Sequence, residues 1–394
     1  MDESFYIEVN CQQKCHAEAR VCGDVFYSRR IKEEERTIIV LADGMGHGIK
    51  ANILATLAST LAVNLTEEHK SVEKIASIIM NTLPEDSVRK MNFSTFTIVE
   101  INAEGVVNIL EYENPQTLVM RGIRLLEPEW NCIVLETEKS SRKEVLTCSF
   151  TATKEDRVIF CSDGVVQSGL EGAMMPSGWG MENLTQFVMD SIHEDRTVSA
   201  EKLAQKVVNK ANQNDHFMPR DDISCAVIYF REPRKLMLCT GPPINPADDR
   251  EFAEILAQFE GTKIISGATT AEIISREWKK EITDSTEFFD PELPPFSSME
   301  GVDIVTEGIL TLSKVHEILK THNNGIVLGK GPADQIVKML LGSDEIHFHI
   351  GTSINPAHWD PSFPSDLEWR RTIVHRIARV LEEKFLKQVF MKFF

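Results

Sequence analysis

The stretch that decides the fold is Thr37-Ile-Ile-Val-Leu-Ala-Asp-Gly-Met-Gly-His-Gly-Ile-Lys50. Its β-branched start, residues 37–40, predicts a buried strand. The three glycines that follow Asp43 predict a tight turn, and a helical pattern begins near Ile49. The strand therefore delivers a carboxylate to its own end, beside bare backbone carbonyl and amide groups. Oxygen ligands in this arrangement suit a hard cation.

Two other interpretations of this stretch compete with a metal site. In the simpler one, Asp43 only caps the helix that follows a glycine-rich turn. In the other, the glycines cradle a dinucleotide, but their spacing is not Gly-x-Gly-x-x-Gly. Glu67 and Glu68, which lie where the ribose-binding acid is sought, fall at a helix end instead of on a second strand. An ionised Asp43 would also repel a pyrophosphate, so the metal site is favoured if more carboxylates lie at strand ends.

Three further segments place aspartates at the ends of apolar strands. Asp24 lies beside a glycine in a β-like segment, and Asp163 closes a hydrophobic run. The pair Asp221 and Asp222 begins another such run. A single Asp-Gly pair is an ordinary turn. Acidic sites on several strand ends are a stronger signal, because crowded carboxylates repel one another unless a cation compensates them.

These acidic motifs occur in a distinctive order. They are Gly-Asp-x-Phe at 23–26, Asp-Gly-Met-Gly-x-Gly at 43–48, Ser-Asp-Gly-Val at 162–165 and Asp-Asp-Ile-Ser at 221–224. As a set they resemble the metal-dependent PPM (PP2C-type) serine/threonine phosphatases, and the Asp-Gly-Met-Gly form is similar to the bacterial SpoIIE/RsbU branch. The resemblance covers residues 1–232. It implies an α+β fold, an α-β-β-α sandwich with two Mn²⁺ or Mg²⁺ ions at one end.

The resemblance also implies the ligands of the two ions. Asp43 would bridge them. Asp24 and the carbonyl group of Gly44 would serve one ion, and Asp163 and Asp221 would hold the other. These four carboxylates are the residues expected to carry catalysis.

The implied reaction is hydrolysis of phosphoserine or phosphothreonine on a partner protein. A hydroxide that bridges the two ions would attack the phosphorus in line. Asp222, the neighbouring position, is expected to join the metal site through water. Eukaryotic relatives have a histidine directly after the Asp-Gly pair as general acid. Here Met45 stands in that place and His47 lies two residues further on, so no such role is expected of His47.

Composition sets outer limits on function. The net charge of −18 argues against a nucleic-acid-binding surface. No run of eighteen apolar residues and no basic leader are seen, so we expect no membrane segment and a cytoplasmic location. Most of the eight cysteines are expected to be reduced core residues. A zinc site at Cys11, Cys15 and His16 is an alternative.

Residues 236–394 predict a second domain after a short polar linker at 231–235. Strand and helix patterns alternate up to a long closing helix at 367–389, which predicts a smaller, layered α/β domain with a mostly parallel sheet. Three features are candidate ligand sites there, each with a simpler structural interpretation. They are the Ile-Asn-Pro-Ala repeat at 244–247 and 354–357, the turn Gly329-Lys-Gly-Pro332, and the histidines His347, His349 and His358.

The sequence thus predicts a bacterial signalling phosphatase of two domains, 1–232 and 236–394. The resemblance implies a phosphorylated STAS-type anti-anti-sigma factor as the protein substrate. The second domain would be a regulatory or ligand-binding element, a small ligand on it and a homodimer both being left open. The alternative is a non-catalytic signalling or ligand-binding protein whose aspartates hold a structural cation.

Overall fold

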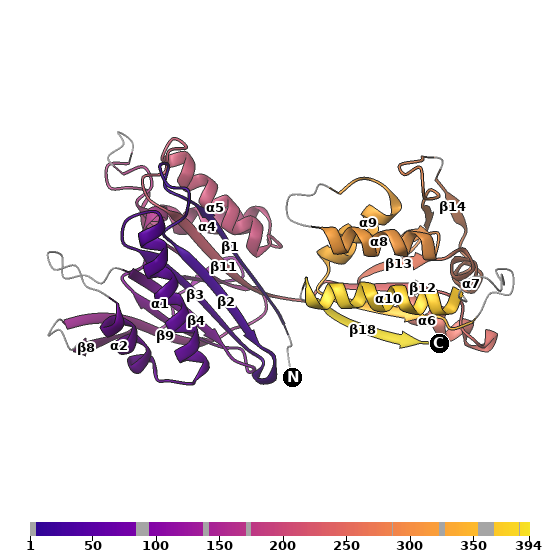
Figure 1. Cartoon of the computed structure of the whole chain (residues 1–394), viewed down its shortest axis with the longest axis horizontal. Helices are drawn as coiled ribbons and strands as arrows, with labels where there is room; N and C mark the ends of the chain where they lie inside the picture. The colour runs from indigo at the N-terminus through magenta and orange to yellow at the C-terminus, as the bar shows by residue number, and fades with distance from the viewer. Residues whose placement is uncertain are drawn as a thin grey trace. The chain divides into compact units, whose positions relative to one another are not determined.

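The computed structural model divides the chain into two compact units, Met1–Glu232 and Pro233–Phe394 (Figure 1). The structure describes residues 5–83, 94–136, 142–170, 175–285, 287–322, 328–353, 366–385 and 387–394.

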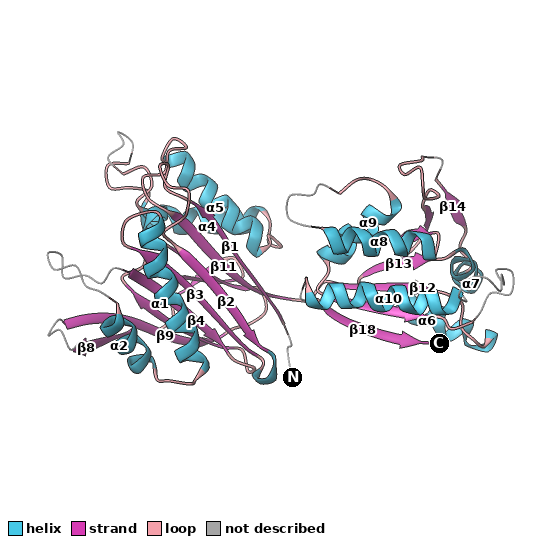
Figure 2. Ribbon diagram, in the orientation of Figure 1, coloured by secondary structure: helices cyan, strands magenta, loops and turns pink. Residues whose placement is uncertain are grey.

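Two antiparallel sheets form the centre of the first unit (Figure 2). The strand order is β1-β11-β10-β6-β7 in one sheet and β2-β3-β4-β5-β9-β8 in the other. The strands are β1 (Tyr6–Lys14), β2 (Val25–Ile31), β3 (Arg36–Gly44), β4 (Ser94–Ile101), β5 (Val106–Tyr112), β6 (Leu118–Arg121), β7 (Arg124–Leu126), β8 (Asn131–Glu136), β9 (Arg142–Thr151), β10 (Asp156–Cys161) and β11 (Ile223–Arg231). The helices are α1 (Ile49–Glu67), α2 (Val72–Thr82), α3 (Asp163–Val166), α4 (Gly180–Glu194) and α5 (Ala200–Asn214).

The buried run of the sequence is β3, and it is covered on both faces. Ile39 and Leu41 pack in the core between the two sheets. The alternate residues Ile38 and Val40 pack under α1 and α2. Helices α4 and α5 cover the outer face of the other sheet. Burial on both faces explains the continuous apolar run, and the layers confirm the predicted α-β-β-α sandwich.

Helix α1 is the one described helix that is long and apolar enough to cross a membrane by length and composition. Its alanines Ala55, Ala58 and Ala62 are fully buried in the cluster that contains β3. A core helix satisfies the same criteria of length and composition, and these contacts show that α1 is part of the core.

The second unit is a seven-stranded sheet with helices on both faces. The order is β14-β15-β16-β13-β12-β17-β18. The neighbouring strands β16, β13, β12, β17 and β18 are parallel, and β14 and β15 form an antiparallel edge. The strands are β12 (Lys235–Thr240), β13 (Thr262–Ser266), β14 (Ile282–Asp284), β15 (Ser297–Met299), β16 (Val302–Thr306), β17 (Glu345–Ile350) and β18 (Gln388–Phe393). The helices are α6 (Asp249–Gln258), α7 (Ala268–Trp278), α8 (Ile309–Thr321), α9 (Pro332–Gly342) and α10 (Asp366–Glu383).

The closing helix predicted over 367–389 is wrong in its last part. Helix α10 ends at Glu383, and β18 pairs in parallel with β17. Residues 388–393 include one valine and two phenylalanines, residue types that favour strands, and Val389 packs against the core. The predicted strand at 325–328 lies almost entirely outside the described residues.

Candidate metal centre

Asp43 lies at the end of β3, on the face that looks into the space between the sheets. Side chains alternate along a strand, so Asp43 continues the row of Ile39 and Leu41 to the rim of that core. Gly44 comes next, and a Cβ atom there would overlap the backbone of Ala51 in α1. Only glycine therefore allows the helix to pack directly on the backbone beside Asp43.

Asp24 is buried just before β2 and is held from the opposite sheet. The Ser224 hydroxyl group donates to Asp24 Oδ2 at 2.5 Å, and Gln13 Nε2 donates to the Asp24 carbonyl oxygen at 3.3 Å. Ser224 lies on the face of β11 that also carries the inter-sheet core residue Ala226. Asp24 thus joins the two sheets at the same rim as Asp43.

Asp163 follows β10 and opens the short helix α3. Gln167 Nε2 donates to Asp163 Oδ2 at 2.8 Å. The next residue, Gly164, packs so closely on the backbone of Asp222 that a Cβ atom would overlap the Asp222 carbonyl oxygen. This contact brings the ends of β10 and β11 together, and with them two of the acidic motifs.

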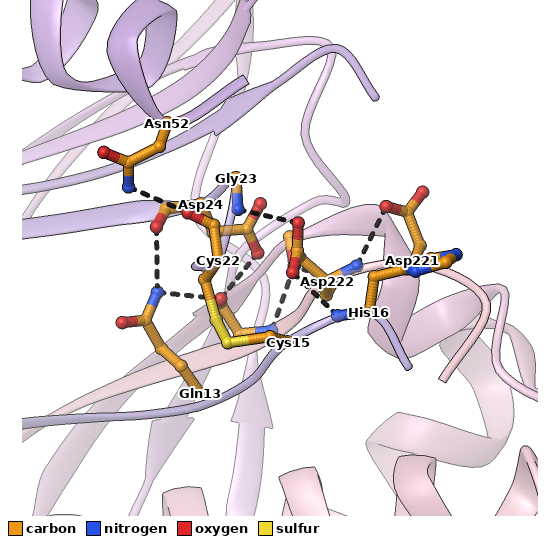
Figure 3. Close-up of a disulfide and its surroundings, with 11 residues drawn as sticks. Gln13, Cys15, His16, Cys22, Gly23, Asp24, Asn52, Asp221 and Asp222 are labelled. Atoms are coloured by element: carbon orange, nitrogen blue, oxygen red, sulfur yellow. Dashed lines mark hydrogen bonds between the residues drawn. A yellow bond between two sulfur atoms is a disulfide. The ribbon is translucent and has the colours of Figure 1, made fainter. Parts of the chain in front are cut away.

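The two aspartates before β11 have different surroundings. The backbone N–H group of Asp222 donates to Asp221 Oδ1 at 2.8 Å, which orients the Asp221 side chain. The Asp222 carboxylate accepts from the N–H group of His16 at 2.9 Å and from that of Gly23 at 2.7 Å (Figure 3). Asp222 therefore holds the backbone that precedes Asp24.

The charges of Asp24, Asp163 and Asp221 meet at Asp43. Its carboxyl group lies close to those of Asp24 and Asp163. Burial, together with the negative charges of these three neighbours, raises the pKa of Asp43 well above its usual value. Burial also raises the pKa of Asp24 to about 7, although hydrogen bonds from serine side chains oppose this shift. Burial raises the pKa of Asp221 to about 6, and the negative charge of Asp163 raises it further. The four carboxyl groups cannot all ionise easily unless a cation is present.

The oxygen atoms of this cluster fit divalent cations. Asp24 Oδ1 and Asp163 Oδ1 are buried and accept no hydrogen bond from any donor in the described part of the chain. Buried carboxylate oxygens without donors are costly unless an ion compensates them. Carboxylate and carbonyl oxygens are the ligands that Mg²⁺ and Mn²⁺ prefer, so the residues present fit the two implied ions.

Sequence reasoning missed a disulfide bond beside this cluster. Cys15 is bonded to Cys22, and Cys11 remains a free thiol. The alternative of a zinc site at Cys11, Cys15 and His16 is therefore wrong for this structure. Six cysteines are free, as expected for most of them, but Cys132 is exposed and Cys11 is only half-buried. The one available signal was a pair of cysteines that flank a polar turn directly before Gly23.

The ligand-site candidates of the second unit have structural roles where they are described. The Asn245 side chain accepts from the N–H group of Ala247 and caps a short helical turn, as its simpler interpretation predicts. The Asp334 carboxylate accepts from the N–H group of Gly329 at 2.9 Å, so the turn before α9 has an internal anion. His347 stacks on Phe390, and His349 lies against Phe394. Residues 354–357 and His358 lie outside the described residues.

A sandwich of two sheets between helices, with aspartates gathered at the ends of its central strands, defines a PP2C-type, metal-dependent phosphatase. The model of the family described as Stage II sporulation protein E (SpoIIE) matches residues 33–231, half of the chain. The chain belongs to the SpoIIE family and is a phosphoprotein phosphatase of bacterial signalling. A comparison with curated proteins finds no match.

Solved structures with a similar fold include several bacterial phosphatases. The phosphatase domain of SpoIIE from Bacillus subtilis is 15% identical, with a TM-score of 0.44, over 58% of this chain and 94% of that one. RsbX in complex with magnesium is 15% identical, with a TM-score of 0.40, over 58% of this chain and 98% of that one. The SiaA PP2C domain of Pseudomonas aeruginosa is 15% identical, with a TM-score of 0.42, over 57% and 84%.

Proposed function

We propose that the first unit hydrolyses phosphoserine and phosphothreonine on a partner protein, with two Mn²⁺ or Mg²⁺ ions at the rim of the sandwich. The observation that supports this proposal is the position of Asp43, a carboxyl group on which the negative charges of Asp24, Asp163 and Asp221 all act. Asp43 would ligate both ions, with Asp24 and the Gly44 carbonyl group on one side and Asp163 and Asp221 on the other.

The surrounding residues orient this ligand set. Ser224 fixes one oxygen atom of Asp24, and Gln167 fixes one oxygen atom of Asp163, so that the second oxygen of each is left for an ion. The N–H group of Asp222 does the same for Asp221. When bound, the ions would supply an activated water and positive charge for the phosphoryl oxygens. The chain then has to position the phosphate ester and exclude competing ligands.

The biological setting of the proposal follows from family membership. A phosphorylated STAS-type anti-anti-sigma protein in the cytoplasm is the substrate that we propose. The second unit, 233–394, would then be a regulatory or ligand-binding element. Its parallel sheet is of a kind that binds ligands at the carboxyl ends of its strands. A homodimer stays a hypothesis.

The test is an Asp43→Asn variant of the full chain. We expect Mn²⁺-dependent hydrolysis of p-nitrophenyl phosphate to fall to background and calorimetric Mn²⁺ binding to be lost, while the circular dichroism spectrum is unchanged. The matched control is Asp190→Asn, because Asp190 is exposed on α4. It should keep both turnover and Mn²⁺ affinity.

The opposite outcome is equally clear. A wild-type chain that binds no Mn²⁺ and hydrolyses neither p-nitrophenyl phosphate nor a phosphorylated STAS protein would support the non-catalytic alternative. A chain that binds Mn²⁺ but turns over only the phosphoprotein would support the proposal, because some switches need their partner to populate the active state.

A further inference from the structure

The segment between β1 and Asp24 is closed into a loop by the disulfide bond between Cys15 and Cys22 (Figure 3). Both cysteines are half-buried, so small reagents can reach them. The loop begins directly after Lys14, the last residue of β1, and ends at Gly23, the residue before Asp24. The covalent cross-link therefore lies two residues from a proposed metal ligand.

The loop is attached to the site at both of its ends. The N–H group that follows Cys15 is that of His16, and the N–H group that follows Cys22 is that of Gly23. Both donate to the carboxylate of Asp222, one to each oxygen. Asp222 can accept both bonds only while the two ends of the loop lie side by side, which is what the disulfide enforces.

The path from this loop to the ligands is short and closely packed. A Cβ atom on Gly23 would lie 2.8 Å from the Cβ atom of Ala51 and 2.8 Å from Asp222 Oδ2, so the backbone fits closely here. Asn52 Nδ2 donates to the Cys22 carbonyl oxygen at 2.8 Å and ties the loop to α1. On the other side, Asp222 donates its N–H group to Asp221. A displaced loop would thus disturb a ligand on either side.

We propose that Cys15 and Cys22 are a reversible thiol–disulfide modification site that sets the metal affinity of the phosphatase centre. The oxidised chain holds Asp24 and Asp221 in place and binds Mn²⁺ or Mg²⁺ tightly. The reduced chain releases the loop and binds the ions more weakly. This inference rests on the proposed function for the identity of the metal ligands.

The chemical step is exchange with a low-molecular-weight disulfide such as oxidised glutathione. One cysteine attacks the reagent and forms a mixed disulfide, and the second cysteine displaces the reagent's remaining thiol. The two cysteine protons leave with the two released thiols, the reagent's S–S bond is reduced, and the protein S–S bond forms. A dithiol reverses the exchange and is itself oxidised to a disulfide. A phosphine also reduces the protein S–S bond, with one water molecule supplying the two thiol protons and the oxygen atom of the phosphine oxide that forms.

Two physical arguments support a regulatory role over a merely structural one. In the cytoplasm, the location proposed above, disulfides are typically transient and redox-sensing. Removal of a partner residue that orients a metal ligand typically lowers metal affinity 10–100-fold. The hydrogen bonds of Asp222 to the loop are partners of this kind, since Asp222 also orients Asp221.

The experiment compares the full chain after oxidation with glutathione disulfide and after reduction with a phosphine. Thiol titration in denaturant should count six free cysteines in the oxidised chain and eight in the reduced one. Calorimetry should show Mn²⁺ affinity about 10-fold or more lower after reduction. Amide hydrogen exchange at His16 and Gly23 should be faster in the reduced chain, and saturating Mn²⁺ should restore turnover.

Variants separate the switch from other thiol chemistry. The double variant Cys15→Ser/Cys22→Ser should have the low Mn²⁺ affinity of the reduced chain and should not respond to oxidation. Cys132→Ser removes an exposed thiol on β8 and should keep the full redox response. Eight free thiols after oxidation, or equal and measurable Mn²⁺ affinities in both states, would overturn the switch alone. No Mn²⁺ binding in either state would overturn the proposed function and, with it, the link to metal.

Discussion

The imidazole ring of His16 stacks on that of His47, with ring centroids 4.1 Å apart and planes 6° from parallel. His16 belongs to the disulfide loop, and His47 belongs to the glycine turn after Asp43. The stack joins the two segments at the rim of the sandwich. It also holds the exposed imidazole ring of His47 near Asp221. The pKa of Asp221 is raised mainly by burial, and His47 acts in the opposite direction and lowers it.

His47 is expected to act on the electrostatics of the rim and not as a general acid. His47→Asn should lower kcat by less than about 10-fold, and equally for p-nitrophenyl phosphate and for a phosphoserine peptide. A general acid contributes about 10²–10⁴-fold, and its loss would affect only the peptide, whose leaving group needs a proton. His193→Asn, at an exposed site on α4, is the control. A selective loss on the peptide would contradict this expectation.

Asp43→Asn should stabilise the metal-free chain while removing its response to metal. One negative charge is lost from a crowded cluster, so the free energy of unfolding with a chelator at about pH 8 should rise by roughly 1 kcal/mol. Added Mn²⁺ should raise the unfolding midpoint of the wild type by mass action and leave that of the variant unchanged. Urea denaturation with and without Mn²⁺ measures both. A variant less stable than the metal-free wild type would argue against charge crowding.

Glu111 should make the first unit less stable as pH rises. Burial raises the pKa of this carboxyl group from 4.5 to about 7, although the N–H and hydroxyl groups of Thr117 both donate to it and oppose the shift. Between these values the folded chain holds a proton that the unfolded chain has released. Its stabilising effect is therefore complete below about pH 4.5 and is lost as pH rises through 7.

Glu111→Gln removes this dependence. Relative to the wild type, the variant should gain up to about 3 kcal/mol in unfolding free energy between the two ends of that pH range. Urea denaturation at saturating Mg²⁺, where the metal-site carboxylates stay ionised, isolates the effect. Parallel stability curves for the two proteins would show that Glu111 titrates normally.

Gly44→Ala should destabilise the first unit by about 1–3 kcal/mol or more, because the added methyl group would overlap the backbone of Ala51. The matched control is Gly342→Ala at the end of α9, where a Cβ atom meets nothing within 4 Å. That change should be neutral or slightly stabilising, since alanine favours helices. Chemical denaturation compares the two, and equal effects would contradict the packing argument.

The first unit could be predicted well because its signals are local. The run that forms β3 shows its burial through composition, and each acidic motif lies next to its own strand. Asp24 and Asp43 lie near Asp163 only because the two sheets pack face to face, and no local sequence pattern encodes that packing. The family resemblance supplied that step, and in the structure the charges of Asp24 and Asp163 both act on Asp43.

The remaining differences arise where tertiary packing decides between local alternatives. Helical spacing continues past Glu383, yet the chain leaves the helix because the edge of β17 is open to pairing with β18. The bond between Cys15 and Cys22 was equally hidden, since pairing depends on the distance between cysteines in space. The hydrogen bonds of Asp222 to the disulfide loop could not be predicted either, because their partners His16 and Gly23 are distant from Asp222 in the sequence.

The close contact of Gly164 with the backbone of Asp222 gives a criterion for judging related sequences found in genomes. A chain can keep every aspartate of the motifs and still lose the centre if a side chain at this position pushes the two strand ends apart. The presence or absence of glycine at this position and at the position of Gly44 should separate homologues that retain hydrolysis from homologues that have lost it and act only as binding proteins.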